Sequence, residues 1–421
     1  MKGASLAEIV GLTVEGDLPE KAVEAALERR WYGQNRDVPG RPYERPKNIE
    51  RVLSLDTRWK NRIRYNEFAR RPEIDGEEIT DAAELELMLW LDEVYRLEVP
   101  VGKVSSIVNV IAARNPHHPV REYLDGLSWD GVERVPSLLS AYYGGKDHAL
   151  YERISVCWLV SSVARIYRPG CKVDSVVILA GSQGVGKSTG LKAMMSDPEW
   201  FSDAGLDLDN KDATMKIHAG VWWYELAELA AVGKKEVEKV KSFVSEVDDH
   251  FRPPYGRRVV QWRRQVVFSG TTNAARFLKD PTGSRRFWPV ETSRIDIEAI
   301  KRDRDQLWAE AVVRFRRGET WHLSRADGQT LKALSDEFQE VDSWEPLISE
   351  WVEGRRGEKF STSELFDGPL QVPPDRRHRG HDNRIATILK ALGCVKAGRG
   401  PRRLGSPRMW MLPALEGANG S

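Results

Sequence analysis

A glycine-rich stretch carries the side chains with the clearest chemistry in this sequence. It combines glycines with a lysine and two hydroxyl residues, in the order Gly181, Ser182, Gln183, Gly184, Val185, Gly186, Lys187, Ser188 and Thr189. Glycines let backbone N–H groups close around phosphate oxygens, a lysine neutralises the β- and γ-phosphates, and a serine hydroxyl binds Mg²⁺. The stretch therefore predicts a phosphate-binding loop, with ATP and Mg²⁺ as the ligands.

A loop of this kind needs a strand before it and a helix after it. The apolar run Val173–Ala180 precedes the loop, and the helix-like segment Gly190–Met195 follows it. Strand and helix patterns continue to alternate up to about residue 320, in Gly220–Leu226, Lys234–Val247, Gln265–Asn273 and Arg286–Val290. This alternation predicts an α/β fold, a P-loop NTPase core whose largely parallel sheet is covered by helices on both faces.

Polar side chains at the ends of these strands supply the rest of a hydrolytic site. Glu225 and Glu228 follow the second core strand, and Asn273 ends the third. Ligands bind at the carboxyl ends of the strands in an open α/β sheet. We therefore expect Glu225 to help hold Mg²⁺, Glu228 to activate water and Asn273 to sense the γ-phosphate, with the reverse assignment of the two glutamates left open.

Two arginines, Arg285 and Arg286, follow a turn with the sequence Asp-Pro-Thr-Gly-Ser. An arginine that projects from a turn can neutralise charge on the transferring phosphoryl group of a neighbouring subunit. We expect one of the two to be catalytic in this way; an ordinary surface pair is the alternative.

The segment Phe251–Arg264 mixes arginines with aromatic residues and contains no acidic residue. Arginine binds phosphate through two hydrogen bonds and aromatic rings stack on bases, so the mixture predicts contact with single-stranded DNA. The candidates are Arg252, Tyr255, Arg257, Arg258, Trp262, Arg263 and Arg264. Lys241, on the preceding helix, is a further candidate for contact with phosphate or DNA.

A second basic region lies in the tail, residues 342–421. Three helical segments, Ser343–Glu353, Thr362–Phe366 and Arg384–Leu392, are followed by a hairpin pattern, which is the outline of a winged helix. Residues 354–409 hold 13 basic and 5 acidic side chains, a net charge of +8, whereas the whole chain has +1. Localised positive charge favours a nucleic-acid backbone. Arg402 and Arg403 are the DNA-binding candidates here.

The N-terminal region gives less specific signals. Residues 1–50 read as a helix and a linker, and residues 51–150 as a helical domain with a short strand or hairpin within Trp59–Phe68. The core domain then covers residues 151–325.

The composition excludes several classes of protein. The 421 residues are 41% apolar and 30% charged, which is typical of a folded chain. The three cysteines, Cys157, Cys171 and Cys394, lack the spacing of a zinc site or a disulfide framework, and most of the 15 tryptophans are expected to be packing residues. No signal peptide or membrane-spanning run is present, so we expect a cytoplasmic protein without a membrane partner.

Six ordered blocks resemble the virulence-associated protein E family, relatives of superfamily 3 helicases within the AAA+ class. The blocks are Gly181–Thr189, Trp222–Leu229, Lys239–Ser245, Phe251–Arg257, Gly270–Asn273 and Phe277–Pro289. The segment His118–Gly131 is similar to the one that precedes the ATPase domain in that family.

The resemblance implies a hexameric, DNA-translocating ATPase that acts in replication of a phage or mobile element in a bacterial host. Lys241 would belong to a lysine-bearing motif, Asn273 would be the sensor, Arg285 or Arg286 the finger supplied in trans, and residues 252–264 would line the central pore. Many relatives carry a primase domain upstream. The roughly 120 residues here look too few and too helical for one, so a separate primase or polymerase chain is an expected partner.

A second hypothesis is an origin-binding initiator or loader. It would use ATP as an assembly switch, bind duplex DNA through its tail and unwind poorly. A small-molecule kinase and a packaging motor fit less well, because the sequence shows neither an acceptor site nor a nuclease domain.

Overall fold

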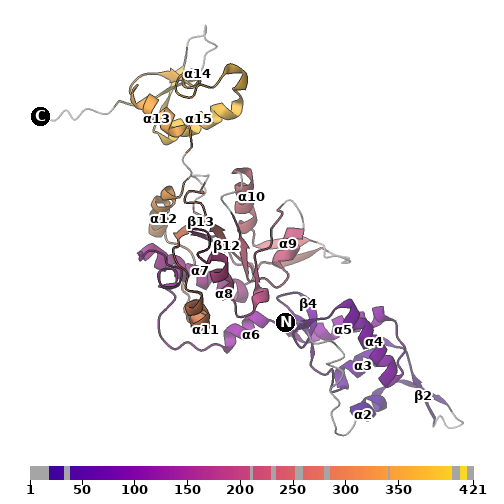
Figure 1. The fold of residues 1–421 in the computed structure, drawn as a ribbon. Helices are drawn as coiled ribbons and strands as arrows, with labels where there is room; N and C mark the ends of the chain where they lie inside the picture. The colour runs from indigo at the N-terminus through magenta and orange to yellow at the C-terminus, as the bar shows by residue number, and fades with distance from the viewer. Residues whose placement is uncertain are drawn as a thin grey trace. The chain divides into compact units, whose positions relative to one another are not determined.

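The computed structural model describes residues 19–32, 38–208, 212–228, 234–251, 259–278, 285–339, 342–400 and 408–414. The chain divides into two compact units, residues 1–338 and 339–421 (Figure 1). The break between them falls close to residue 342, where the sequence predicts that the C-terminal domain begins.

A five-stranded sheet forms the centre of the first unit. Its strand order is β13-β7-β12-β9-β8, and every neighbouring pair is parallel. The strands are β7 (Val176–Ala180), β8 (Phe201–Ser202), β9 (Trp223–Leu226), β12 (Val267–Thr272) and β13 (Phe287–Glu291). Four of the five correspond to the strands predicted from the sequence, and β8 was not predicted.

Helices cover this sheet on both faces. In β7, Val177 and Leu179 enter one hydrophobic core, whereas Val176, Ile178 and Ala180 enter another. Successive side chains of a strand point to opposite faces, so the two cores lie on the two faces of the sheet. The fold class is therefore mixed α/β with a parallel sheet between helices, as predicted.

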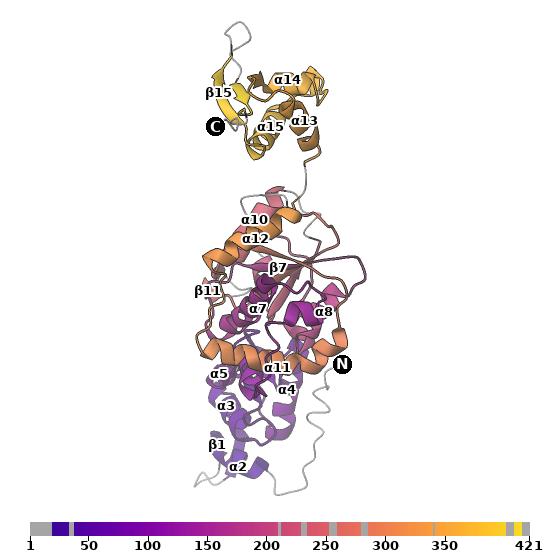
Figure 2. The ribbon, with the colours of Figure 1, turned by 90° about the vertical axis from the view of Figure 1, so that its left-hand side faces the viewer.

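Different helices contribute to the two cores (Figures 1 and 2). The first core contains α6 (Pro119–Gly126), the π-helix η1 (Leu138–Tyr142), α7 (Ala149–Tyr167), α8 (Lys187–Ala193), α11 (Ile297–Arg316) and part of α12 (Arg325–Glu337). The second core contains side chains of α9 (Asp212–Ile217) and α10 (Lys234–Ser245).

Tryptophans fill much of the first core. Trp158 stacks on Trp223 with ring centroids 4.6 Å apart, and Trp222 stacks on Trp308 at 4.3 Å. All four side chains are almost completely buried. The prediction that tryptophans serve packing is confirmed for these residues.

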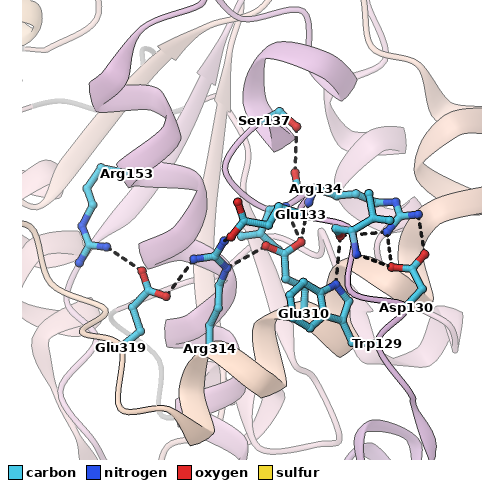
Figure 3. A network of polar contacts seen from close by, with 11 residues as sticks. Trp129, Asp130, Glu133, Arg134, Ser137, Arg153, Glu310, Arg314 and Glu319 are labelled. Carbon is cyan, nitrogen blue, oxygen red and sulfur yellow. Dashed lines mark hydrogen bonds and ion pairs between the residues drawn. The ribbon is translucent and has the colours of Figure 1, made fainter.

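A buried carboxylate ties the segment before η1 to helix α11 (Figure 3). Glu310 accepts hydrogen bonds from the backbone N–H groups of Arg134 and Val135 at 2.6 and 2.9 Å. It also accepts one from Arg314 Nε at 2.8 Å, and Arg314 in turn pairs with Glu319. The network fixes the segment before η1 through its backbone N–H groups.

Residues 19–117 pack around a core of their own. Their helices are α2 (Pro19–Ala26), α3 (Pro46–Leu55), α4 (Asp81–Tyr95) and α5 (Val101–Arg114). Their strands are β1 (Arg29–Tyr32), β2 (Val38–Pro42), β3 (Ile63–Asn66), β4 (Arg71–Ile74), β5 (Glu77–Glu78) and β6 (Pro116–His117).

The prediction of a helical N-terminal domain is only partly correct. A four-stranded sheet in the order β5-β4-β3-β6 lies among the helices, and only β3 falls within the predicted strand region. The expected boundary at residue 50 falls inside α3, so it does not separate two domains.

An antiparallel pair extends from the central part of the unit. β10 (Asp248–Phe251) pairs with β11 (Val260–Arg263), in a register that places Asp248 opposite Arg263. The sequence predicted a hairpin arm over 257–264, and the described part of that arm is a strand.

The second unit has its own hydrophobic core, built around Ile348, Leu365, Ile385 and Trp410. Its helices are α13 (Glu345–Glu353), α14 (Thr362–Asp367), the short 3₁₀ helix η4 (Pro374–Arg376) and α15 (Arg379–Ala391). Its strands, β14 (Phe360–Ser361), β15 (Val395–Arg399) and β16 (Arg408–Met411), form an antiparallel sheet in the order β14-β16-β15. The three predicted helices and the hairpin are present, and β14 was not predicted.

Within the described ranges, no helix combines the length and the apolar character that crossing a membrane requires. All three cysteines are free, as their spacing indicated.

Candidate active site

The glycine-rich loop connects β7 to α8 through a backbone that requires glycine. Gly184 and Gly186 have φ angles of +85° and +93°, in the left-handed region that other residues rarely adopt. A Cβ atom at Gly181 would lie 2.3 Å from the carbonyl oxygen of Thr292. The glycines therefore fix the path of the chain between the strand and Lys187, the first residue of α8.

Lys187 is buried and its ammonium group is fully hydrogen-bonded. Its Nζ donates to the carbonyl oxygens of Gly181 at 2.7 Å and Ser182 at 2.9 Å, and to Asn273 Oδ1 at 2.8 Å. Burial lowers the pKa of Lys187, and the charges of Glu228 and Glu225 oppose that shift. A cation lies inside the loop, held by neutral oxygens and attracted by two carboxylates.

Glu225 lies on the buried side of the site. Its Oε1 accepts hydrogen bonds from Ser188 Oγ at 2.7 Å and from Thr271 Oγ1 at 2.5 Å. Its Oε2 is buried and has no hydrogen-bond partner among the described residues. An unpaired carboxylate oxygen beside a serine hydroxyl leaves an acceptor free for a cation.

These oxygens suit Mg²⁺, which prefers hard oxygen ligands and takes most of its remaining ligands from water and substrate phosphates. In the part of the chain that the structure describes, no group of three or more histidine, cysteine or acidic side chains is arranged to hold a metal ion by itself. Ser188 and Glu225 fit an ion whose remaining ligands come from the substrate, as those of Mg²⁺ do in phosphoryl-transfer sites.

Glu228 and Asn273 form the exposed side of the site. Asn273 Nδ2 donates to Glu228 Oε1 at 2.9 Å, while Asn273 Oδ1 accepts from Lys187. Because β12 lies between β7 and β9 in the sheet, the carboxyl ends of the three strands meet at one edge. The structure thus brings together five of the residues that the sequence singled out: Lys187, Ser188, Glu225, Glu228 and Asn273.

Arg285 and Arg286 lie elsewhere. Arg286 Nε donates to Ser245 Oγ at the end of α10 at 2.8 Å and is 3.9 Å from Asp174 Oδ2. Arg285 is exposed, and its carbonyl oxygen accepts from Trp288 Nε1 at 3.0 Å. Arg286 contacts Ser245 and Asp174 rather than the glycine-rich loop.

Trp262 and Arg263 lie on β11. The Trp262 ring packs against His218 at 5.3 Å and carries the Arg70 guanidinium 4.4 Å from its centroid. Arg263 is exposed. Both positions remain compatible with the predicted contact to single-stranded DNA.

Arg264 is a correction to the predicted DNA interface. Its side chain is completely buried, and it pairs with Asp249 through Nε at 2.6 Å and with Glu246 through Nη2 at 2.8 Å. Its guanidinium also lies 4.3 Å from the centroid of Phe243. Arg264 joins β11 to α10 and β10, and its donors face protein oxygens, so it does not contact DNA.

Lys241 is also buried, and its Nζ is 2.8 Å from Glu238 Oε1. The remaining predicted DNA contacts, Arg252, Tyr255, Arg257, Arg258, Arg402 and Arg403, lie outside the described residues.

Two residues that shape the site, Thr271 and Thr292, were not predicted from the sequence. Thr271 donates to Glu225, and Thr292 Oγ1 donates to the carbonyl oxygen of Ala180 at 3.1 Å beside the start of the loop. Thr271 lies in the Gly270–Asn273 block, where its place on a buried strand was a usable signal. Thr292 follows β13, and only the pairing of that strand with β7 brings it to the loop.

Comparison with known proteins gives one family and several distant structural likenesses. The family described as virulence-associated protein E-like domain matches residues 124–340. No curated protein matches the chain.

Two apo structures of the NrS-1 C-terminal region are among the similar solved structures. One has 12% sequence identity and a TM-score of 0.47, and covers 84% of this chain and 96% of that chain. The other, the A form, has 12% identity and a TM-score of 0.41, with 69% and 78% of the two chains covered. The family assignment rests on the matched sequence, which spans more than half of the chain and includes the whole candidate site. The chain belongs to the virulence-associated protein E-like family.

Proposed function

We propose that this chain hydrolyses ATP and uses the energy to translocate on single-stranded DNA and unwind duplexes, during replication of a phage or mobile genetic element. One observation carries the proposal. Lys187, Asn273 and Glu228 are linked by hydrogen bonds, and Ser188 is hydrogen-bonded to Glu225. Both groups lie at the carboxyl edge of one parallel sheet, next to a loop whose glycines have left-handed backbone angles.

Each residue has a role that its position suits. Lys187 would exchange its contacts with Gly181 and Ser182 for the β- and γ-phosphates. Ser188 and Glu225 would hold Mg²⁺, which neutralises charge on the phosphate oxygens. Thr271 keeps Glu225 in place through its hydroxyl group, and Asn273 links the lysine to Glu228.

Glu228 is the group that we assign to the attacking water. Its carboxylate is exposed and accepts one hydrogen bond from the described residues, through Oε1, which leaves Oε2 to orient a water molecule. Glu225 is buried and occupied by two hydroxyl groups, which suits a metal ligand better than a base. This division is the one that the sequence favoured.

The fold supports the same proposal. A P-loop NTPase core of the AAA+, superfamily 3 helicase type accounts for the parallel sheet and for the position of the loop after β7. In the second unit, the order helix, strand, helix, helix, strand, strand is that of a winged helix. Its net charge of +8 over residues 354–409 favours a DNA backbone.

The assembly belongs to the proposal as well. We assign a homo-oligomer, a hexameric ring, in which Arg285 or Arg286 of one subunit completes the site of the next. Single-stranded DNA would pass along β10 and β11, a separate primase or polymerase would be a partner, and the ring would act in the cytoplasm of a bacterial host.

A second candidate is an ATP-switched initiator or loader. The observation that favours it is the separate second unit, whose basic residues 354–409 could bind duplex DNA independently of the ATPase unit. Such a protein would bind origin DNA tightly and displace strands weakly.

The ATPase rate with and without single-stranded DNA, measured together with the solution mass in the presence of ATP, tests the proposal. A ring motor predicts stimulation by DNA and an oligomer with ATP. A brisk rate without stimulation, together with weak strand displacement, favours the initiator. Absence of hydrolysis under all conditions rejects both.

A further inference from the structure

A polar cavity of about 330 Å³ lies between the N-terminal sheet and β11. It is separate from the glycine-rich loop, because none of residues 181–189 lines it. Its charged lining consists of three arginines, Arg70, Arg121 and Arg263, and one glutamate, Glu67. Burial lowers the pKa of His118 to about 4, so the imidazole in this lining is neutral at pH 7. The cavity therefore has an excess of positive charge.

Arg70 is the central cation of this cavity. The turn before it is fixed by Asn66, whose Oδ1 accepts from the backbone N–H groups of Phe68 and Ala69 at 2.9 and 2.8 Å. Arg70 itself has a φ of +58°, a left-handed angle that only a well-held turn maintains in a residue of this size. The turn directs the guanidinium over the Trp262 ring, 4.4 Å from its centroid.

The Arg70 side chain is half-buried and has no close carboxylate partner among the described residues. Its Nε is buried without a hydrogen-bond partner in the described part of the chain, and its Nη2 reaches the carbonyl oxygen of Arg263 at 3.5 Å. Burial lowers the pKa of Arg70, because it outweighs the attraction of Tyr65 and Glu67. A half-buried cation with an unused donor gains free energy when an anion binds beside it.

The other two arginines of the cavity, Arg121 and Arg263, differ in how they are held. Arg121 donates from Nε and Nη2 to the carbonyl oxygen of Ile166 at 3.1 and 3.0 Å, and its Nη1 is 3.9 Å from Glu67 Oε2. Arg263 is exposed on β11. Arg121 is therefore held in place by protein oxygens, whereas the Arg263 side chain is accessible to a ligand from solvent.

The hairpin connects this cavity to the proposed path of DNA. Gln261 and Arg263 are the exposed residues that alternate along β11, and both line the cavity. Gln261 is held by Asp248 of the neighbouring strand, at 2.9 Å from Nε2 to Oδ2. A strand of nucleic acid that follows the exposed face of β11 passes the opening of the cavity.

We infer that this cavity binds a backbone phosphate of single-stranded nucleic acid, with Arg70 and Arg263 as the donors. The inference rests on the proposed function, which places such a strand along the hairpin. It gives the N-terminal region a share in DNA binding, because Arg70 comes from the turn between β3 and β4.

The test is equilibrium binding of a fluorescent oligodeoxythymidine to the full chain without ATP, between about 50 and 200 mM salt. The variants are Arg70→Gln and Arg263→Gln. Each is expected to weaken binding about tenfold at the low-salt end, because a charged hydrogen bond is lost. Each is also expected to reduce the slope of log K against log salt by about 0.7, the value for one phosphate contact on a single strand.

The control is Arg302→Gln. Arg302 is an exposed arginine of α11, it pairs with Asp303, and it does not line the cavity. It is expected to bind with the affinity and salt slope of the wild type. Arg263→Gln keeps the inference testable if Arg70→Gln fails to fold, because Arg263 is exposed.

Wild-type affinity and slope in both cavity variants would overturn the inference and leave the ATPase proposal intact. If these variants lose DNA binding and the wild-type protein hydrolyses no ATP, the phosphate site in the cavity is supported and the ATP-driven motor is rejected. Inorganic phosphate, added at constant ionic strength, serves as a competitor of oligonucleotides of different length. If it competes equally well with all of them, the cavity is a site for free phosphate, and the assignment to a nucleic-acid strand is overturned.

Discussion

Glu225 and Glu228 belong to the same short segment but have different surroundings. Glu225 is buried and accepts hydrogen bonds from two hydroxyl groups, whereas Glu228 is exposed and accepts one from Asn273. The two carboxylates are three residues apart in the sequence, and their different surroundings give them different chemistry.

Exchanging each glutamate for glutamine separates the two roles. Glu225→Gln should raise the Mg²⁺ concentration needed for half-maximal hydrolysis by about 10- to 100-fold, because a charged metal ligand is lost. Glu228→Gln should lower kcat by about 10²- to 10⁴-fold with unchanged nucleotide affinity, because water activation is lost. Magnesium titrations and steady-state rates of both variants measure this. The opposite pattern would assign the roles the other way round.

The residues of the site were predictable because their chemistry is specific to a short motif or a strand end. Arg264 was misassigned for a physical reason. The stretch Phe251–Arg264 contains no acid, but Glu246 and Asp249, just before it, fold back onto the guanidinium. Charge counted along the sequence does not show which arginines are neutralised in space.

At the scale of the elements, Glu310 connects α11 to the segment 129–137 (Figure 3). The carboxylate is buried and satisfies two backbone N–H groups together with Arg314. Its removal leaves the two backbone N–H groups and Arg314 Nε without their acceptor, whereas the other Arg314 nitrogens keep Glu133 and Glu319.

Glu310→Ala should therefore lower the free energy of unfolding by about 3 kcal/mol, as for other buried charges that lose their partner. The control is Glu298→Ala on the same helix, where an 82% exposed side chain pairs only with Lys301. That change should stay within about 0.5 kcal/mol. Urea denaturation measures the free energy of unfolding of both variants. If Glu310→Ala lowers it no more than Glu298→Ala does, the buried network is not stabilising.

The long apolar strands of the central sheet were predictable, whereas the short strands were not. β7, β9 and β12 are buried runs with clear boundaries. β6 and β14 are two residues long and exist only because distant strands pair with them. The strand β4 contains Pro72, which sequence rules place outside central strands. These elements depend on tertiary contacts and leave no local pattern.

At the scale of the whole molecule, the chain consists of a unit that contains the candidate site and a smaller unit with its own core. Within the smaller unit the charge is uneven, because residues 354–409 have a net charge of +8 whereas residues 339–353 carry only acidic charges. The proposed division between hydrolysis and DNA binding therefore assigns DNA contact to residues 354–409.

A chain that ends at residue 338 should keep its basal ATPase rate, because the whole candidate site lies in the first unit. Its affinity for DNA should fall most at low salt, because the contribution of the second unit to binding is electrostatic. Binding isotherms at several salt concentrations measure the effect. An unchanged slope of log K against log salt would exclude a role of the second unit in DNA binding.

The central claim is that the loop at residues 181–189 binds ATP through Lys187, and the ATPase rate of Lys187→Ala tests it most directly. The matched control is Lys192→Ala, which removes an exposed lysine of the same helix. The account predicts that Lys187→Ala hydrolyses no ATP above background, while Lys192→Ala turns over at the wild-type rate. Normal turnover by Lys187→Ala would contradict it.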